Sequence, residues 1–325
     1  MAQDILVVGE IADGALNSTT AELLGAASRL ADGGKVGVTL LGSGASGVAS
    51  AAFAAGADRA YVNDDAGYDA FRSDPWVNAV QEAAKQASPA VILTAQSTVG
   101  RELAPRLAFR LDSAAAMDCT RLEMAGDSFR VTRPSYGGNA LAVFSFVTSP
   151  AIASVRAKSQ DPLEPQREGA SGETIQLPSP AESRVEIAAR DYAVAEGLPL
   201  QDAPVVVSGG RGLGGPEGFE LVEALADAIG RDKATVGSSR AACDLGWYPV
   251  ACQVGLTGKV VTPDLYIAIA ISGASQHMAG CSGAKNIVAI NRDPEANIFK
   301  SCRYGVVGDY KQVVPALIEA IKNLD

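Results

Sequence analysis

His277 is the only histidine of the 325-residue chain, and it lies in a stretch of small and polar residues, ISGASQHMAGC. A neutral imidazole can donate one hydrogen bond and accept another, and its ordinary pKa is close to neutral pH. The residues between this histidine and the preceding apolar run are Ser272, Gly273, Ala274, Ser275 and Gln276. Ligands of parallel α/β sheets bind beyond the carboxyl ends of the strands. The segment is therefore a candidate ligand site, although a lone histidine more often has a structural role.

Three glycines near residue 210 follow the pattern G-x-G-x-x-G, a fingerprint of dinucleotide-binding turns. They are Gly210, Gly212 and Gly215, and they lie between a strand-like run, VVVS, and a helix-like run at 216–230. Such a turn lets the backbone approach a pyrophosphate, and the helix N-terminus that follows favours anions. The pattern is weak evidence by itself, because glycine-rich turns also serve geometry alone.

Arg240 ends the next strand-like run, 234–240, directly after Ser239. NAD-binding folds usually carry Asp or Glu at this point, because a carboxylate accepts a hydrogen bond from the ribose. The lack of an acidic residue here argues against an ordinary NAD site. An arginine can instead bind a 2′-phosphate, lie against a flavin or form a surface ion pair.

Three further loops follow strand-like runs in the second half of the chain. One loop, QVGLTGKVV, has glycines on both sides of Thr257, a second begins at Asn291, and a third begins at Asp309. Each loop alone is compatible with a simple turn. Together with the segments above, they predict a crevice for a long, nucleotide-like cofactor.

Two α/β regions must position these loops. The strand-like runs of the first 115 residues alternate with helix-like runs, and they span 5–10, 35–42, 59–64 and 90–97. Short apolar strands separated by amphipathic helices predict parallel strands with helical crossovers. The same alternation returns from residue 203 onward. We predict two Rossmann-like three-layer α/β domains, which comprise residues 1–190 and 191–325.

Between these regions the sequence pattern changes. Strand-like runs separated by turn residues span 117–124, 128–136, 139–147 and 151–158. We expect these runs to be antiparallel and to extend the first sheet. Residues 159–182 are polar and rich in proline, and we interpret them as an extended linker.

Composition excludes several classes of protein. The net charge is −10 and basic residues are not clustered, so we expect no nucleic-acid binding. No apolar run approaches 18 residues, so we expect no direct membrane insertion. The five cysteines form no C-x-x-C motif, and with one histidine they predict free thiols and no metal site. The first strand-like run begins at Ile5, which predicts no signal peptide and a location in the bacterial cytoplasm or the mitochondrial matrix.

The motifs of the second half resemble those of electron transfer flavoprotein α subunits. The segments VVSGGRGL, SSRAACDLGW, QVGLTGKVV, LYIAIAISGASQHMAG, IVAINRDPEANIF and YGVVGDY follow in the order and spacing of that family. The resemblance is dense over residues 203–323 and looser over the N-terminal domain. It implies an electron carrier, rather than a substrate-converting enzyme, with one FAD in the C-terminal domain.

The resemblance also implies partners. Family members take electrons from flavin dehydrogenases of the acyl-CoA or amine type and pass them to a membrane quinone oxidoreductase. The α subunit forms a heterodimer with a β subunit, which its N-terminal domain contacts. The β subunit holds AMP, or a second FAD in electron-bifurcating members.

The resemblance assigns cofactor contacts to particular residues and no catalytic residue. Arg240 corresponds to an arginine over the flavin ring, Thr257 to a hydroxyl near flavin N5, and His277 to an imidazole near flavin O2. The segment before His277 corresponds to a pyrophosphate cradle, and Asn291 to a position on the adenosine half. The full expected set is Arg211, Ser239, Arg240, Val254, Gly255, Leu256, Thr257, Ser272, Gly273, Ala274, Ser275, Gln276, His277, Asn291, Asp309 and Tyr310.

The chain departs from the motifs of the family at three positions. Leu256 stands where glutamine is usual, so a side-chain hydrogen bond near the flavin is missing. Arg303 stands where an acidic residue usually precedes Tyr-Gly, and Asn297 replaces a usual proline. We interpret these departures as marks of a specialised member with its own dehydrogenase partner.

Other hypotheses stay open at the level of the sequence. Arg240 could bind the 2′-phosphate of NADP in a domain that resembles transhydrogenase. The chain could also be an electron-bifurcating member of the family, or a structural or regulatory paralogue that has lost its flavin.

Overall fold

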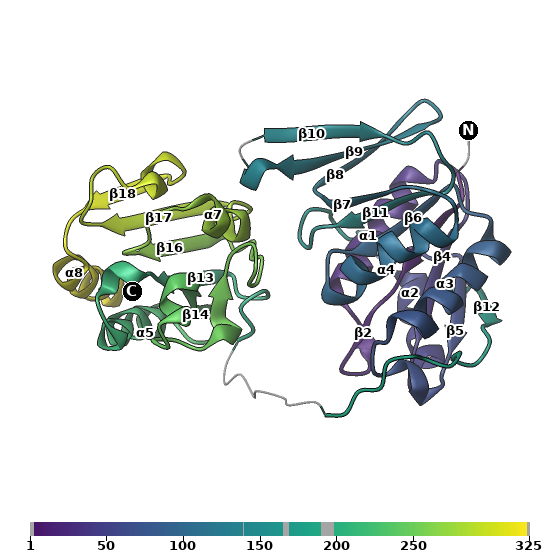
Figure 1. Cartoon of the computed structure of the whole chain (residues 1–325), viewed down its shortest axis with the longest axis horizontal. Coiled ribbons are helices and arrows are strands. Elements are labelled where there is room, and N and C mark those ends of the chain that lie inside the picture. Colours follow the sequence, from purple (N-terminus) through teal and green to yellow (C-terminus); the bar gives the residue numbers. More distant parts are fainter. Residues whose placement is uncertain (1–2, 139, 165–168, 190–197, 324–325) are drawn as a thin grey trace. The chain divides into compact units, whose positions relative to one another are not determined.

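The structure is a computed structural model of the chain, and it describes residues 3–138, 140–164, 169–189 and 198–323. The chain divides into two compact units (Figure 1). The first comprises Met1–Ser135 and Leu141–Arg190, and the second comprises Tyr136–Ala140 and Asp191–Asp325. The predicted domain boundary between residues 190 and 191 lies outside the described residues.

A seven-stranded parallel sheet forms the centre of the first unit, in the order β12-β5-β4-β1-β6-β11-β7. The strands are β1 (Ile5–Val8), β4 (Val36–Leu41), β5 (Arg59–Asn63), β6 (Val91–Ala95), β7 (Ala115–Cys119), β11 (Ala151–Val155) and β12 (Glu173–Gln176). The helices are α1 (Ser18–Leu30), α2 (Ala45–Ala54), α3 (Ser73–Ala87) and α4 (Thr98–Arg110). The alternation predicted for this region is confirmed.

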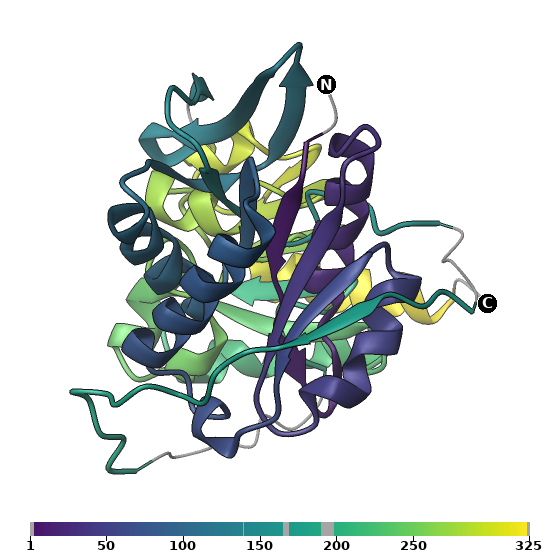
Figure 2. The same cartoon turned by 90° about the vertical axis from the view of Figure 1, so that its right-hand side faces the viewer.

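Helices cover both faces of this sheet (Figures 1 and 2). Ile5 and Val7 of β1 pack in one core with α1 and α2, whereas Leu6 and Val8 pack in the other with α3 and α4. Because both faces are covered, β1, β4 and β6 are buried along their whole length. This burial explains why the predicted strands are continuous apolar runs.

The expected antiparallel extension is only partly correct. A separate three-stranded sheet, in the order β10-β9-β8, contains β8 (Arg121–Ala125), β9 (Ser128–Ser135) and β10 (Ala140–Ser145). Strands β8 and β9 are antiparallel. Strands β7 and β11, however, join the large sheet in parallel, because β11 enters between β6 and β7. A small antiparallel pair, β2 (Ile11–Ala12) and β3 (Ala15–Leu16), also belongs to this unit.

The interpretation of residues 159–182 as an extended linker is also partly wrong. Residues 173–176 form strand β12, which pairs in parallel with β5 at the edge of the large sheet. The chain beyond this strand is held by the side chain of Asn63, whose amide donates to the carbonyls of Leu177 and Pro178. This stretch therefore packs on the first unit. Residues 165–168 of the expected linker lie outside the described residues.

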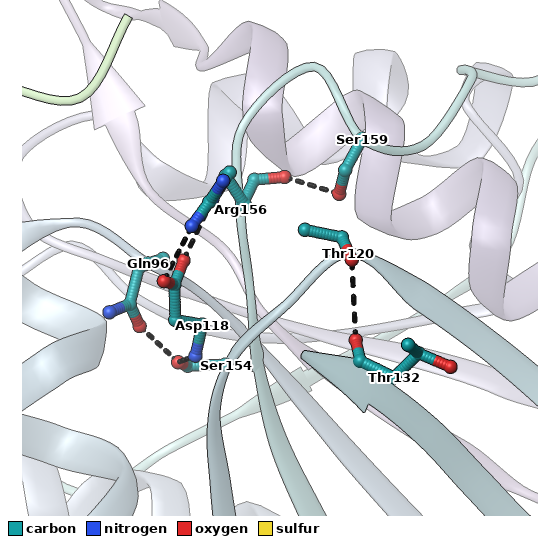
Figure 3. A network of polar contacts seen from close by, with 7 residues as sticks. All are labelled: Gln96, Asp118, Thr120, Thr132, Ser154, Arg156 and Ser159. Atoms are coloured by element: carbon teal, nitrogen blue, oxygen red, sulfur yellow. Dashed lines mark hydrogen bonds and ion pairs between the residues drawn. The ribbon is translucent and has the colours of Figure 1, made fainter. Parts of the chain in front are cut away.

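A polar network joins the carboxyl ends of β6, β7 and β11 (Figure 3). Arg156 donates two hydrogen bonds to the carboxylate of Asp118, at 2.7 and 2.9 Å. The backbone N–H of Asp118 donates to the Ser154 hydroxyl at 3.0 Å, and that hydroxyl donates to Gln96. The side chains of the ion pair are 11 % and 24 % exposed. The network thus links three neighbouring strands through a largely buried charge pair.

A six-stranded parallel sheet forms the centre of the second unit, in the order β15-β14-β13-β16-β17-β18. The strands are β13 (Val205–Gly209), β14 (Ala234–Ser239), β15 (Gln253–Val254), β16 (Leu265–Ile269), β17 (Asn286–Asn291) and β18 (Tyr304–Val307). The helices are α5 (Phe219–Ile229), α6 (Arg240–Asp244), α7 (Ser275–Cys281) and α8 (Tyr310–Lys322). The predicted three-layer α/β fold is confirmed for this region too.

The two faces of this second sheet have separate cores. Helices α5 and α8 pack with Val207 and Ile269 on one face, whereas α7 packs with Val206 and Tyr266 on the other. Short 3-10 helices follow several strands, at Arg211–Leu213, Pro216–Gly218, Val250–Cys252 and Asn297–Lys300. Within the described ranges, no helix has the length and apolar character needed to span a membrane.

The ion pair of the first unit leads to a stability prediction. The substitution Asp118→Asn keeps the size of the side chain but leaves the Arg156 guanidinium without its counter-charge. We expect the free energy of unfolding of the first unit to fall by about 2 kcal/mol, because one partner of a largely buried pair is removed. The measurement is urea unfolding followed by Trp76 fluorescence in a Trp247→Phe background, since Trp76 and Trp247 are the only tryptophans.

The matched control is Glu123→Gln, because Glu123 pairs with Arg121 on the surface of the same unit. We expect this change to alter the free energy by less than about 0.5 kcal/mol. Equal effects of the two substitutions would contradict the structural importance of the Arg156–Asp118 pair.

Candidate cofactor-binding cleft

The strand order of the second sheet creates a crevice beside its central strand. The chain leaves β13 through α5 to reach β14 on one side, and it later returns to β16 on the other side. The carboxyl ends of β13 and β16 are neighbours, because Gly209 and Ile269 pair in register. Such a switch point is the usual ligand site of open α/β sheets.

A cleft of about 670 Å³ lies at these strand ends. This volume is typical of small-molecule and cofactor sites. The predicted residues that line it are Arg211, Ser239, Arg240, Val254, Gly255, Leu256, Thr257, Ser272, Ala274, Gln276, His277 and Asn291. The structure therefore brings most of the candidate residues together from five separate loops.

Four predicted residues do not line the cleft. Gly273 and Ser275 lie at the start of α7, whereas Asp309 and Tyr310 lie at the start of α8. Asp309 accepts a hydrogen bond from the Lys311 N–H at 2.9 Å and caps α8. The buried Tyr310 hydroxyl donates to the Leu213 carbonyl at 2.8 Å, which ties α8 to the glycine-rich turn. Any cofactor contact of these four residues stays a prediction.

The glycine-rich turn is shaped by its contact with the end of β16. The N–H of Gly210 donates to the Ile269 carbonyl at 2.9 Å, and that of Gly212 donates to the Ala270 carbonyl at 3.2 Å. A Cβ atom on Gly210 would lie 2.3 Å from the Ala270 oxygen. The close approach of two loops thus explains these glycines, and Arg211 is the residue of the turn that carries a charge to the cleft.

The loop after β15 and helix α7 form one continuous wall. The N–H of Leu256 donates to the Gln276 carbonyl at 2.7 Å, and the N–H of Val261 donates to the Gly280 carbonyl at 2.7 Å. The Gln253 amide donates to the Thr257 hydroxyl oxygen at 3.0 Å. The hydroxyl hydrogen of Thr257 is then left to donate to a ligand.

His277 is buried in this wall, and only 7 % of its surface is exposed. Its Nε2 atom lies 2.9 Å from the hydroxyl oxygen of Tyr266. Its Nδ1 atom is buried and has no hydrogen-bond partner among the described residues. Burial lowers the pKa of the imidazole to about 4, although the nearby Val254 carbonyl opposes this effect. The ring is therefore neutral at pH 7.

Arg240 lies at the edge of the cleft as the first residue of α6. Its guanidinium lies 3.2 Å from the Asp244 carboxylate, and both side chains are more than half exposed. The Ser239 hydroxyl caps the helix by accepting from the Ala242 N–H at 3.4 Å. An exposed pair of this kind is weak, so Arg240 can exchange its partner for a ligand at little cost.

Asn291 connects two of the loops that surround the cleft. Its amide nitrogen donates to the Ile271 carbonyl at 2.9 Å, and its amide oxygen accepts from the Asp293 N–H at 3.0 Å. The side chain thus holds the ends of β16 and β17 together. A structural role for Asn291 accounts for both of these contacts.

Sequence reasoning missed part of the lining. The additional residues are Ala241, Asp244, Gln253, Ala270, Ile271, Arg292 and Ala296, whereas Gly212 and Asp293, which also line the cleft, belong to the predicted loops. The spacing of four residues between Arg240 and Asp244 could have indicated their ion pair. Nothing in the sequence pattern indicates that Gln253 orients Thr257, since this contact depends on the shape of the loop.

The residues of the cleft fit a flavin nucleotide. An unpartnered buried nitrogen on His277 calls for a polar ligand atom, because an unpaired buried polar group is costly. Arg211 and Arg240 supply cations for phosphates or for an electron-rich ring. No group of three potential metal ligands exists among the residues that the structure describes, and the five cysteines are free.

The tight turn before α7 leads to a prediction. Gly273 has a φ of +80°, and a Cβ atom there would lie 2.2 Å from the Ile298 nitrogen. We expect Gly273→Ala to lower the free energy of unfolding of the second unit by about 3 kcal/mol, because strain and overlap add. The matched control is Gly214→Ala, where φ is +89° but nothing lies within 4 Å.

The control separates backbone strain from steric overlap. We expect Gly214→Ala to cost only about 1 kcal/mol, since strain acts there alone. The measurement is urea unfolding followed by Trp247 fluorescence in a Trp76→Phe background. Equal costs for the two substitutions would show that overlap with Ile298 does not restrict Gly273.

Burial of His277 predicts how stability depends on pH. The unfolded chain binds a proton on this histidine below a pH of about 6.5, but the folded chain does so only below about 4. Lowering the pH from 7 to 4.5 therefore favours unfolding, by roughly 2–3 kcal/mol from this group. Between pH 7 and pH 4.5, we expect the free energy of unfolding of the second unit to fall more in the wild type than in a His277→Asn variant. The difference between the two falls should equal this contribution, and unfolding measured at both pH values checks it. Parallel losses in the two proteins would contradict the burial of a neutral imidazole.

Comparison with known proteins places the chain among electron transfer flavoproteins. The model of the electron transfer flavoprotein domain matches residues 5–182, and that of the electron transfer flavoprotein FAD-binding domain matches residues 199–282. The α subunit from Thermoanaerobacterium thermosaccharolyticum is 39 % identical over 99 % of this chain and 98 % of its own length. The α subunit from Bacillus subtilis is 37 % identical over 100 % of this chain and 99 % of its own length.

The α subunit from Mycobacterium tuberculosis strain H37Rv is 41 % identical to the chain, and the similarity covers 98 % of each protein. These similarities extend over both units rather than over the flavin domain alone. The chain therefore belongs to the electron transfer flavoprotein family, as an α subunit with an FAD-binding domain.

Proposed function

We propose that this chain binds one FAD in the cleft of its second unit and shuttles electrons between protein partners. The observation that carries this proposal is the convergence of Arg211, Arg240 and His277 on one cleft at the switch point of the sheet. Residues 199–282, which contain all three, match an FAD-binding domain. The donors that we propose are flavin dehydrogenases of the acyl-CoA or amine type, and the acceptor is a membrane quinone oxidoreductase.

The residues of the cleft would hold FAD through complementary charge and hydrogen bonds. When bound, FAD supplies the redox chemistry. Arg240 offers a permanent positive charge beside the ring, and Thr257 offers a hydroxyl hydrogen. Ser272 and Ala274 line the cleft at the start of α7, where backbone N–H groups suit a phosphate. Neutral His277 completes the wall.

The first unit has a different task in this proposal. Residues 1–190 would contact a β subunit, and residues 191–325 would form the FAD domain of a heterodimer. The partner would hold AMP, or a second FAD if the pair is electron-bifurcating. We propose that the heterodimer works in the bacterial cytoplasm or the mitochondrial matrix.

An NADP-binding domain is the second candidate function. It is favoured by the position of Arg240 at the end of β14, where the sequence lacks an acidic residue. Asp244 argues against it, because its carboxylate lies 3.2 Å from the Arg240 Nε atom and would repel a 2′-phosphate. A flavin ring carries no such dianion, so FAD suits this arrangement better.

The proposal predicts that Arg240 contributes to FAD affinity. We expect Arg240→Gln to weaken FAD binding about tenfold, because a charged donor at the cleft is replaced by a neutral one. The matched control is Arg231→Gln, since Arg231 forms a similar surface pair with Asp227 in the same unit but does not line the cleft. FAD binding is measured by absorbance and fluorescence titration of the full chain.

The same titration with NADPH distinguishes the two candidates. A yellow protein that binds FAD and ignores NADPH supports an electron carrier. A colourless protein that binds NADPH, with affinity lost in Arg240→Gln, would favour the NADP-binding alternative.

A further inference from the structure

A buried hydrogen bond connects the imidazole of the cleft to the centre of the second sheet. Tyr266 is the second residue of β16 and is completely buried. Its hydroxyl oxygen lies 2.9 Å from His277 Nε2, although the two residues belong to different elements. The rings are tilted by 55° with centroids 6.0 Å apart, so this contact is a hydrogen bond rather than stacking.

The direction of this hydrogen bond follows from the neighbours of the Tyr266 hydroxyl. The Ser208 hydroxyl and the Cys281 thiol lie beside it. The Cys281 thiol donates to the His277 backbone carbonyl at 3.6 Å. Ser208 Oγ is buried and has no hydrogen-bond partner among the described residues, so the His277 nitrogen is the hydrogen-bond partner that the structure gives the Tyr266 hydroxyl there. The Tyr266 hydrogen is then free for the imidazole, whose unprotonated nitrogen is the best acceptor nearby.

A neutral imidazole carries one proton, and the two ring nitrogens share it between two tautomers. If Nε2 accepts from Tyr266, the proton must lie on Nδ1. Nδ1 belongs to a residue that lines the cleft, and it is the ring nitrogen without a protein partner among the described residues.

We infer that Tyr266 is a positioning residue, which donates to His277 Nε2 and thereby fixes the imidazole as an Nδ1–H donor. A partner hydrogen bond of this kind is the general means by which proteins select one tautomer. The donor would meet an acceptor atom of the ligand, such as a ring carbonyl oxygen of a flavin. Only this last step rests on the proposed function, because the tautomer itself is a property of the chain without FAD.

The single histidine makes the inference directly testable. The full chain is labelled with 15N-histidine and freed of FAD, so that one imidazole gives all the ring signals. Nitrogen chemical shifts and two-bond couplings at pH 7 report which nitrogen carries the proton. We expect the Nδ1–H tautomer to dominate in the wild type, and Tyr266→Phe to lose this dominance. A mainly Nε2–H ring in the wild type would overturn the inference, even if the variant did not fold.

The matched control is Tyr248→Phe, which also removes a hydroxyl that forms a hydrogen bond in the second unit. Tyr248 donates to Glu223 at 3.1 Å and stacks on Phe219, in the core on the other face of the sheet from the core that contains Tyr266. We expect this variant to keep the wild-type tautomer. A Tyr266→Phe protein that folds and also keeps it would overturn the role of Tyr266.

Adding FAD to the labelled chain separates this inference from the proposed function. We expect FAD to shift the Nδ1–H signal of the wild type, and to bind about fivefold more weakly to Tyr266→Phe, because the donor is no longer fixed. Wild-type FAD affinity in a folded Tyr266→Phe variant would overturn the positioning role. If FAD fails to bind the wild type, the proposed function fails, while the tautomer measured without FAD still decides the inference.

Discussion

The contact between Gly255 and Gly280 is the constraint on which the candidate site depends. A Cβ atom on Gly280 would lie 2.3 Å from the Gly255 nitrogen, so a side chain at position 280 would block this approach. The approach lets α7 form backbone hydrogen bonds with the loop after β15, at Leu256 and Val261. His277 and Thr257 then lie on one wall of the cleft, although twenty residues separate them in the sequence. Close backbone packing, rather than any side-chain pair, therefore assembles this wall.

Much of the fold could be predicted because buried parallel strands require continuous apolar runs. β1 and β6 are buried on both faces and were recognised in this way. The direction of β11 could not be predicted, because an apolar run looks the same in a parallel and an antiparallel sheet. β12 was missed for a different reason: three of its four residues are exposed, so its sequence ETIQ carries no hydrophobic signal.

The carboxyl-end rule predicted which loops of the second unit would meet, but not how each side chain is used. The rule depends only on strand direction, and the register of Gly209 with Ile269 makes it hold here. The use of Asn291 and Tyr310 depends on distances that only the folded chain sets. Both side chains form hydrogen bonds to backbone carbonyls of neighbouring loops, so they stabilise the surroundings of the cleft. Tyr310 thus supports the site without lining it, whereas Asn291 both lines the cleft and holds two of its loops together.

The cleft contains two polar side chains that differ in exposure: one is exposed to solvent, and the other is buried. Arg240 carries a permanent charge and stays exposed, so little desolvation cost opposes its placement. His277 is buried, and it can be buried because it is neutral and its Nε2 atom contacts Tyr266. Leu256 contributes to the cleft mainly through its backbone. Its N–H holds the loop by a hydrogen bond to Gln276, whereas its side chain is 57 % exposed. Glutamine at this position is therefore not needed for the shape of the loop, and the leucine changes only what the side chain presents at the mouth of the cleft.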